Sequence, residues 1–194
     1  MASSKRDLLI DTAQNLFYQH GFKATGIDTI LAESGVAKKT LYNHFASKEA
    51  LIVACLNRRD QQLLTLLENN IERLAPTQQC EPELANIMAF FDALSHWINS
   101  DTFFGCMFIN ASAEYHDFDH PVHLACTEHK VLVIKLIEQQ LGKLALTDRL
   151  ATAKQLAILA DGAIVGAHTT HDFESAIHAK SVARALLASQ RQAA

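Results

Sequence analysis

Glycine and proline are scarce in this sequence of 194 residues, which contains 7 and 3 of them. The chain is instead rich in Ala, Leu, Gln, Lys and Glu, which favour helices over strands. This composition argues against an all-β protein and predicts an all-α one. With 49% apolar residues, the chain is long enough to bury a core in one large domain or two modest ones.

Long apolar runs are missing as well. No stretch of 18 or more uncharged apolar residues occurs, so the sequence predicts no membrane partner. The first residues, MASSKRDLLIDTAQ, carry charges within their apolar segment and lack a small-residue cleavage site, which argues against a secretory signal. We therefore expect a cytoplasmic protein.

Motifs of catalysis and of metal binding are also lacking. The sequence has no HExxH motif, no Gly-rich phosphate loop and no nucleophile–base pair, so we expect neither an enzyme nor a cofactor. None of the four cysteines forms a CxxC pair, which predicts free thiols at the following positions: Cys55, Cys80, Cys106 and Cys126.

Acidic and histidine side chains do gather between residues 114 and 123, where they could suggest a metal site. Pro121 predicts that a helix begins there, so His116 and His120 would not lie on one helical face, and His120 is predicted to cap that helix. We expect no metal, although a metal-responsive regulator stays open as an alternative. The cluster comprises Glu114, His116, Asp117, Asp119, His120 and His123.

Charge is unevenly distributed along the chain. Residues 1–60 hold 8 basic and 6 acidic side chains, whereas residues 61–194 hold 9 and 15, within a net charge of −4. A mildly basic N-terminal part on an acidic remainder is compatible with a nucleic-acid partner for the first part, but it needs a motif to support it.

Apolar residues recur at helical spacing along most of the chain. Gly21 and Gly35 are placed to end the first two helices, Thr25 with Asp28 resembles a capping box, and Ser47 is placed to cap the fourth helix. The pattern predicts helices at about residues 5–20, 26–34, 38–45, 48–74, 83–99, 103–115, 121–141, 149–168 and 174–190.

Residues 25–45 have the layout of a helix-turn-helix, in which the second helix enters the DNA major groove. Apolar residues would hold the two helices at a fixed angle: Ile27, Ile30, Leu31, Val36 and Leu41. The exposed side of the second helix would offer Lys38, Lys39, Thr40, Tyr42, Asn43 and His44, which suit base edges and phosphates. By pattern alone, a surface helical hairpin remains an alternative.

The segment GFKATGIDTILAESGVAKKTLYNHFASKEAL closely resembles the DNA-binding head of TetR-type transcriptional regulators. Departures from the family pattern are small: Leu31 and Ser34 stand for alanines, and Ala37 stands for a serine or threonine. The matching positions are Phe17, Gly21, Phe22, Thr25, Ile30, Gly35, Val36, Leu41, Tyr42, His44, Phe45, Lys48, Glu49 and Leu51.

The resemblance implies a three-helix DNA-binding head at residues 1–47 and a helical ligand-binding and dimerisation body at residues 48–194. It also implies a homodimer through the last two long helices, which binds a palindromic double-stranded DNA operator and is released by a small-molecule inducer. Most members repress transcription. A helical binding protein that does not bind DNA is the alternative from another class.

Carried over by position, the resemblance makes Tyr42 and Lys48 phosphate contacts, supported by Thr40 and His44. Lys38, Lys39 and Asn43 become candidates for base-edge or phosphate contacts, and Thr25 would cap the second helix. The alternatives are that Tyr42 packs inside the head, that His44 bridges to the first helix, and that the two lysines are only solvated.

Large side chains are concentrated in the first part of the body, where FFGCMFINASAEY resembles a stretch familiar in related TetR-type members. We expect a ligand pocket lined by Trp97, Phe104, Cys106, Met107, Phe108 and Asn110, although aromatic residues at helical spacing are usually core. Cys106 near a helix N-terminus could be an electrophile or oxidant sensor, or a buried structural thiol.

Overall fold

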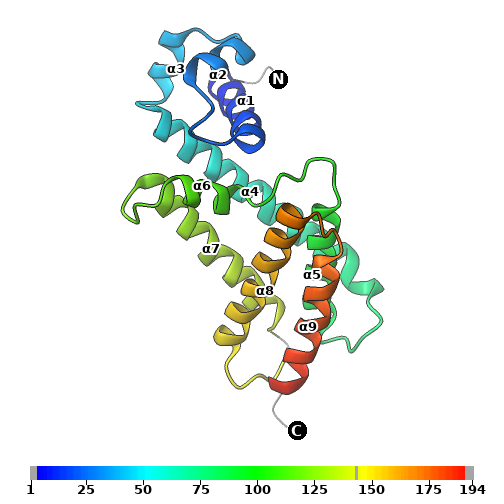
Figure 1. Ribbon diagram of the computed structural model, residues 1–194. Coiled ribbons are helices and arrows are strands. Elements are labelled where there is room, and N and C mark those ends of the chain that lie inside the picture. Colours follow the sequence, from blue (N-terminus) through cyan, green and yellow to red (C-terminus); the bar gives the residue numbers. More distant parts are fainter. Residues whose placement is uncertain (1–3, 143, 191–194) are drawn as a thin grey trace. The chain divides into compact units, whose positions relative to one another are not determined.

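A computed structural model describes residues 4–142 and 144–190 of the protein. Over these residues the chain contains nine α-helices, one 3-10 turn and no strand, which confirms the predicted all-α class (Figure 1). The elements are α1 (Lys5–His20), α2 (Ile27–Ser34), α3 (Lys38–His44), α4 (Lys48–Leu74), η1 (Ala75–Thr77), α5 (Ala85–Ile98), α6 (Met107–Glu114), α7 (Pro121–Gln140), α8 (Arg149–Thr170) and α9 (Ser175–Gln190).

The described residues form two compact units. Unit 1 contains the chain up to Gln62 and the segment Cys106–His129, so it holds α1 to α3, the start of α4, α6 and the start of α7. Unit 2 contains Leu63–Gly105 and the chain from Lys130, so it holds α5, α8, α9 and the remainders of α4 and α7. The predicted boundary between residues 47 and 48 remains a prediction.

The core of unit 1 begins on α1, which lies against α2 and α3 (Figure 1). The buried residues of α1 are Leu9, Ile10, Ala13 and Phe17. Gly21 ends α1 with a φ of 87°, and its N–H donates to the carbonyl of Phe17 at 3.0 Å. The chain then folds back so that the rings of Phe17 and Phe22 stack 5.3 Å apart. Both rings are buried, and an apolar contact of this kind commonly accompanies a C-cap glycine.

The helix pair α2–α3 forms around a tight turn. Gly35 ends α2 in the left-handed conformation, with φ 65° and its N–H bound to the carbonyl of Leu31 at 3.0 Å. Val36 is buried inside the turn, and α3 turns Leu41 and Phe45 inward. The predicted helix-turn-helix arrangement is therefore confirmed, and α2 begins at Ile27, one residue later than expected.

The N-cap of α4 agrees with the prediction as well. The N–H of Ala50 donates to Ser47 Oγ at 3.2 Å, so this hydroxyl satisfies one of the free amides of the first turn. The 27-residue helix that follows keeps the predicted bounds, Lys48–Leu74.

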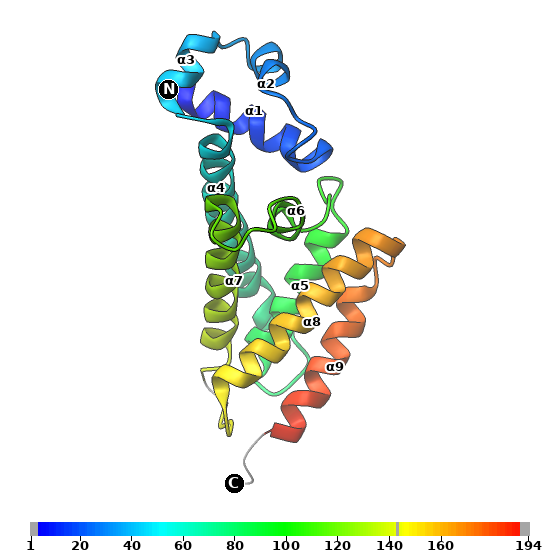
Figure 2. The same ribbon diagram turned by 60° about the vertical axis from the view of Figure 1, so that its left-hand side comes forward.

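Unit 2 is a helical bundle in which α5, α8 and α9 lie side by side (Figures 1 and 2). Small buried residues let α8 and α9 approach each other closely. The buried Ser175 hydroxyl donates to the carbonyl of Ala163 at 2.8 Å across this contact. The alanines that carry the packing are Ala153, Ala157, Ala160, Ala163 and Ala167 of α8, with Ala176, Ala179 and Ala183 of α9.

By length and composition alone, α8 is long and apolar enough to cross a bilayer, and 39% of its most apolar window is buried inside the protein. A core helix of a bundle satisfies the same criterion. Here the helix packs against α9, and its Asp161 accepts a hydrogen bond from Lys130 at 2.5 Å. Packing against α9 buries the alanine face of α8, whereas Ile158 on another face is exposed.

The helix predicted at residues 103–115 is shorter than expected, because α6 begins only at Met107. Gly105 has a φ of 81° and Cys106 is extended, so neither can continue a helix towards Phe103. At Gly105 the backbone also lies so close to His168 that a Cβ atom would come within 2.9 Å of the ring.

Candidate nucleic-acid interface

The outer face of α3 carries the polar side chains that the sequence predicts there. Because Leu41 and Phe45 lie four residues apart and both point into the core, the residues between and before them face outward. Tyr42 is 47% exposed, so it does not pack inside the head. Thr40 is half-buried, and the exposed members of this face are Lys38, Lys39, Tyr42, Asn43 and His44.

The exposed ammonium groups of Lys38 and Lys39 are available to a partner. Lys38 Nζ lies 3.5 Å from Asp28 Oδ1, but both side chains are largely exposed, so water screens the pair. Such a surface pair contributes roughly 0–1 kcal/mol and can be exchanged for a phosphate. The face therefore combines positive charge with hydroxyl and amide groups, which is the chemistry that DNA backbones and base edges require.

Lys48, at the start of α4, is held against the turn between α1 and α2. Its Nζ donates to the carbonyl oxygen of Lys23 at 3.3 Å, and the side chain is half-buried. This contact fixes the position of one ammonium group predicted to bind phosphate.

Thr25 does not cap α2, and this prediction was wrong. Gly26 is the N-cap residue and α2 has no side-chain cap bond, whereas the buried Thr25 hydroxyl donates to the carbonyl of Gly21 at 2.8 Å. The chain between α1 and α2 is compact enough to turn this hydroxyl inward. Thr25 therefore supports the turn by its side chain, and its predicted DNA contact would need the backbone.

The α1–α2 turn is also held by Glu114 at the end of α6, a residue that no sequence motif assigns to this site. The N–H groups of Phe22 and Lys23 donate to the Glu114 carboxylate at 2.8 and 2.6 Å. Lys23 Nζ lies 5.7 Å from the centre of the Tyr115 ring. Burial, with the negative charges of Glu49 and Glu114, raises the pKa of the Tyr115 phenol.

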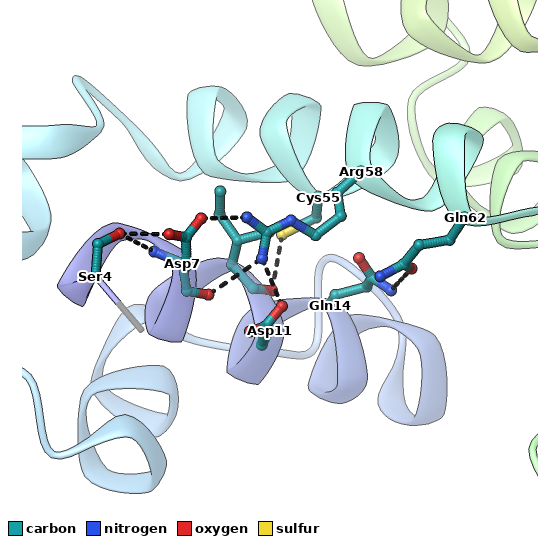
Figure 3. Close-up of polar contacts among 8 residues, drawn as sticks. Ser4, Asp7, Asp11, Gln14, Cys55, Arg58 and Gln62 are labelled. Carbon is teal, nitrogen blue, oxygen red and sulfur yellow. Dashed lines mark hydrogen bonds and ion pairs between the residues drawn. The ribbon is translucent and has the colours of Figure 1, made fainter. Parts of the chain in front are cut away.

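A polar seam joins α1 to α4 beside the helix pair (Figure 3). Arg58 forms ion pairs with Asp7 and, at 2.5 Å, with Asp11, so α4 holds the first turns of α1. The Ser4 hydroxyl and then the Arg58 guanidinium lower the pKa of Asp7. Cys55 Sγ lies behind them, 3.6 Å from the carbonyl of Ile10, and burial raises the pKa of this thiol.

A hollow of about 450 Å³ opens next to this seam in unit 1. Its rim carries the Arg6 guanidinium, which lies 5.4 Å from the centre of the Phe45 ring. His44 lines this hollow, so the imidazole lies at the junction of α3 with α4 as well as being exposed.

The six residues predicted to line a ligand pocket divide between the two units. Trp97 and Phe104 belong to unit 2, where the Trp97 ring meets Phe103 edge to face at 5.2 Å. Cys106, Met107 and Phe108 are buried in unit 1, where Phe108 stacks on His129. Asn110 follows them on α6. The pocket therefore remains a prediction.

The histidines near Pro121 have local partners. The Val122 N–H donates to His120 Nδ1 at 3.2 Å, which confirms the predicted cap, and the His120 ring lies 4.8 Å from that of Tyr115. His123 Nδ1 lies 2.8 Å from the carbonyl oxygen of Tyr115. Within residues 4–142 and 144–190, no three His, Cys, Asp or Glu side chains are placed to hold a metal ion together.

Comparison with known proteins places residues 9–55 in the family model described as "Bacterial regulatory proteins, tetR family". The chain is 32% identical to the HTH-type transcriptional repressor ComR of Escherichia coli over 106 residues, which are 54% of this chain and 48% of that protein. It is 29% identical to the E. coli repressor NemR over 141 residues, 70% of this chain and 66% of NemR. The chain thus spans about half to two thirds of the length of these curated relatives.

Solved structures extend the similarity over nearly the whole chain. SCO4454, a TetR-family transcriptional regulator from Streptomyces coelicolor, superimposes with a TM-score of 0.83 at 29% identity and covers 97% of this chain and 96% of its own. The reduced form of E. coli NemR gives a TM-score of 0.77 at 27% identity, with coverages of 94% and 97%. The resemblance first found in residues 17–51 therefore includes the fold of the remainder.

Proposed function

This chain belongs to the TetR family of bacterial regulatory proteins, and on this premise we propose that it is a homodimeric repressor that binds a palindromic DNA operator. A small molecule bound in the C-terminal body would release the operator. The carrying observation is the helix pair α2–α3, whose second helix presents cationic, hydroxyl and amide side chains on one exposed face. Such a protein works where the chromosome is, in the cytoplasm, and needs no catalytic group.

The DNA contacts follow from this exposed face. Tyr42 and Lys48 would bind phosphate, with support from Thr40 and His44, while Lys38, Lys39 and Asn43 would reach base edges or neighbouring phosphates. The backbone at Thr25 would also contact the DNA. A lysine on phosphate releases a counterion, so each such contact adds about one to the slope of log affinity against log salt.

The first experiment selects an operator from random double-stranded DNA and measures its affinity over a range of salt concentrations. The variant Tyr42→Ala/Lys48→Ala should bind at least tenfold more weakly, with helicity unchanged, since two phosphate contacts are lost in each protomer. Lys135→Ala removes one exposed lysine from α7 and serves as the control, with affinity expected to stay the same. Selection of no specific sequence would refute the proposal, and unchanged binding by the double variant would refute the contact assignments.

The dimer would form through α8 and α9. Their alanine faces pack together inside unit 2, whereas several β-branched side chains on the other faces are exposed, Ile158 by 70% and Ile177 by 55%. Next to Ile158 lies an apolar hollow of about 350 Å³, flanked by Lys130, Lys154 and Asp161. A second copy that packs its own α8 and α9 here would cover these side chains, as the family resemblance implies.

Ile158→Glu should convert the dimer to a monomer, because a partner that covers this position would have to desolvate the new carboxylate. Phe118→Glu is the matched control, since Phe118 is 77% exposed in the loop before α7 and lies outside the proposed interface. Sedimentation equilibrium measures the mass of both variants. A dimeric Ile158→Glu protein would exclude this face as the interface.

The inducer site would use the residues predicted on either side of Gly105: Trp97, Phe104, Cys106, Met107, Phe108 and Asn110. Trp97 is the one tryptophan in the sequence, so its fluorescence reports ligands that bind nearby. A screen of apolar and aromatic small molecules should find compounds that quench this fluorescence, raise the melting temperature and release the operator. Compounds that release DNA without affecting Trp97 would place the site elsewhere.

A response to electrophiles or oxidants is the second candidate. Cys106 is the N-cap residue of α6, a helix N-terminus of the kind at which reactive cysteines occur, and the related E. coli repressor NemR has been solved in a form described as reduced. Treatment with N-ethylmaleimide should then release the operator from the wild type but not from Cys106→Ser. Equal release from both proteins would discard Cys106 as the sensor.

A further inference from the structure

We propose that Glu114 is a positioning residue for operator binding, which fixes the orientation of the helix pair by binding two backbone amides of the α1–α2 turn. The inference rests on the proposed function. It concerns a carboxylate on α6, 91 residues further along the chain than the turn that it binds.

The Glu114 contact is a two-point bond between a carboxylate and consecutive amides. Phe22 N donates to Oε1 at 2.8 Å and Lys23 N to Oε2 at 2.6 Å, so both oxygens are used. These amides directly follow Gly21, where the chain turns with φ 87° at the end of α1. Hydrogen bonds to a charged acceptor are about twice as strong as neutral ones.

Gly21 also makes room for the carboxylate. A Cβ atom at this position would lie 3.1 Å from Glu114 Oε1, so the backbone approaches the side chain as closely as a glycine allows. The C-cap of α1 and the last residue of α6 are therefore fitted to each other. A single surface ion pair would not need this fit.

The other groups of the turn are bound as well. Lys48 Nζ donates to the carbonyl oxygen of Lys23, and the Thr25 hydroxyl donates to that of Gly21. The turn thus joins α1 and α4 to α6. Since α1 ends and α2 begins at this turn, a fixed turn fixes the direction in which α2 and α3 leave it.

This direction matters because a dimer must present two recognition helices about one DNA turn, roughly 34 Å, apart. If each helix pair could swing, only a fraction of the molecules would have both pairs in register, and the apparent affinity would fall by that fraction. Each protomer has its own fraction of correctly oriented helix pairs. The loss of operator affinity in the dimer is therefore the product of the losses in the two protomers. Binding of one helix pair to one half-site would not change.

The test compares Glu114→Gln with the wild type and with the control Glu128→Gln, which removes an exposed carboxylate from α7 in the same unit. A glutamine side chain has one carbonyl oxygen, so it can accept from only one of the two amides. The probes are the operator selected in vitro by the wild type, the same duplex with one or two base pairs added or removed between the half-sites, and a single half-site.

We expect Glu114→Gln to lose about tenfold or more in affinity for the full operator. Its affinity for the single half-site should stay unchanged, and it should discriminate less between spacings. Glu128→Gln should behave as the wild type. Unchanged or tighter operator binding by Glu114→Gln, or equal losses on operator and half-site, would overturn the proposal.

Hydrogen exchange provides a readout that does not depend on DNA. The amides of Phe22 and Lys23 should be protected in the wild type and should exchange faster in Glu114→Gln, whereas amides within α1 keep their protection. If the wild type selects no operator, the proposed function fails while this measurement still tests the contact. If Glu114→Gln does not fold, Glu114→Asp keeps the charge but withdraws it by one methylene, and the same losses are expected from it.

Discussion

Replacing Gly21 with alanine should destabilise the protein by about 1–4.5 kcal/mol, and two separate contributions to this value can be measured. The first comes from the backbone. With φ 87° and ψ 162°, Gly21 occupies a region that is essentially restricted to glycine, and forcing another residue into it costs about 1–3 kcal/mol. The lower conformational entropy of an unfolded alanine chain offsets about 0.4–1 kcal/mol of this cost.

The second contribution comes from Glu114. The new Cβ would lie 3.1 Å from Oε1, so the carboxylate has to move and its bonds to the Phe22 and Lys23 amides lengthen. A hydrogen bond to a charged group contributes about 1.5–3 kcal/mol, and weakening two of them adds roughly 1–2 kcal/mol to the loss.

Gly35→Ala is the matched control. Gly35 also has a positive φ, 65°, but no atom lies within 4 Å of the position that its Cβ would take. A left-handed alanine costs about 1–2 kcal/mol, and the same entropy offset leaves about 0–1.5 kcal/mol. Gly35→Ala should therefore destabilise the protein clearly less than Gly21→Ala does.

Urea unfolding followed by circular dichroism gives both free energies of unfolding. In a protein that already carries Glu114→Ala, Gly21→Ala should cost only its backbone contribution. The contribution from Glu114 should disappear, because no carboxylate remains for the Cβ to displace. Equal effects of the two glycine substitutions, or an unchanged cost of Gly21→Ala in that background, would show that the close approach of the α1–α2 turn to α6 is absent.

Three other outcomes follow from burial and charge. Ellman's reagent should modify Cys80 rapidly in the native protein, whereas Cys55 and Cys126 should react only after unfolding, since both are buried. The pKa of Asp7 is lowered by folding, so its carboxylate stabilises the protein above the pKa of the unfolded chain, near pH 4, and this stabilisation is lost as the pH falls through the pKa of the folded protein. The difference in urea midpoint between wild type and Asp7→Asn should therefore shrink below pH 4. A difference that stays constant with pH would contradict the pairing with Arg58. Phe17→Ala should cost about 3–5 kcal/mol in thermal unfolding because the ring is 1% exposed and stacks on Phe22, and a loss below 1 kcal/mol would be inconsistent with that packing.

Most helix boundaries could be predicted from the sequence because their signals are local. Gly21, Gly35, Ser47 and Pro121 each act within one helical turn, and the structure places a helix end at each of them. The start of α6 could not be predicted in this way. Apolar spacing continues back to Phe103, but Gly105 takes a positive φ where its backbone lies against His168, 63 residues further along the chain.

The candidate DNA interface likewise contains positions that the sequence predicts and contacts that only the fold creates. The exposed positions on α3 follow from periodicity, since Leu41 and Phe45 had to point inward and the polar residues between them could not. The inward turn of Thr25 and the contact of Lys48 with Lys23 depend on how the α1–α2 turn packs against its neighbours. The sequence pattern predicts a cap for Thr25, and the family resemblance implies a phosphate contact for Lys48.

By itself, the sequence determined an all-α chain, the order and extent of its helices, and a helix-turn-helix with a polar outer face at residues 25–45. These properties depend on periodicity and on caps, which act over a few residues and can be recognised in a linear pattern. Only the tertiary structure decided that Glu114 binds the amides of Phe22 and Lys23. A bond between a side chain and backbone amides leaves no signature in the identity of the residues that supply the amides, so it became visible only once the fold had brought α6 against the α1–α2 turn.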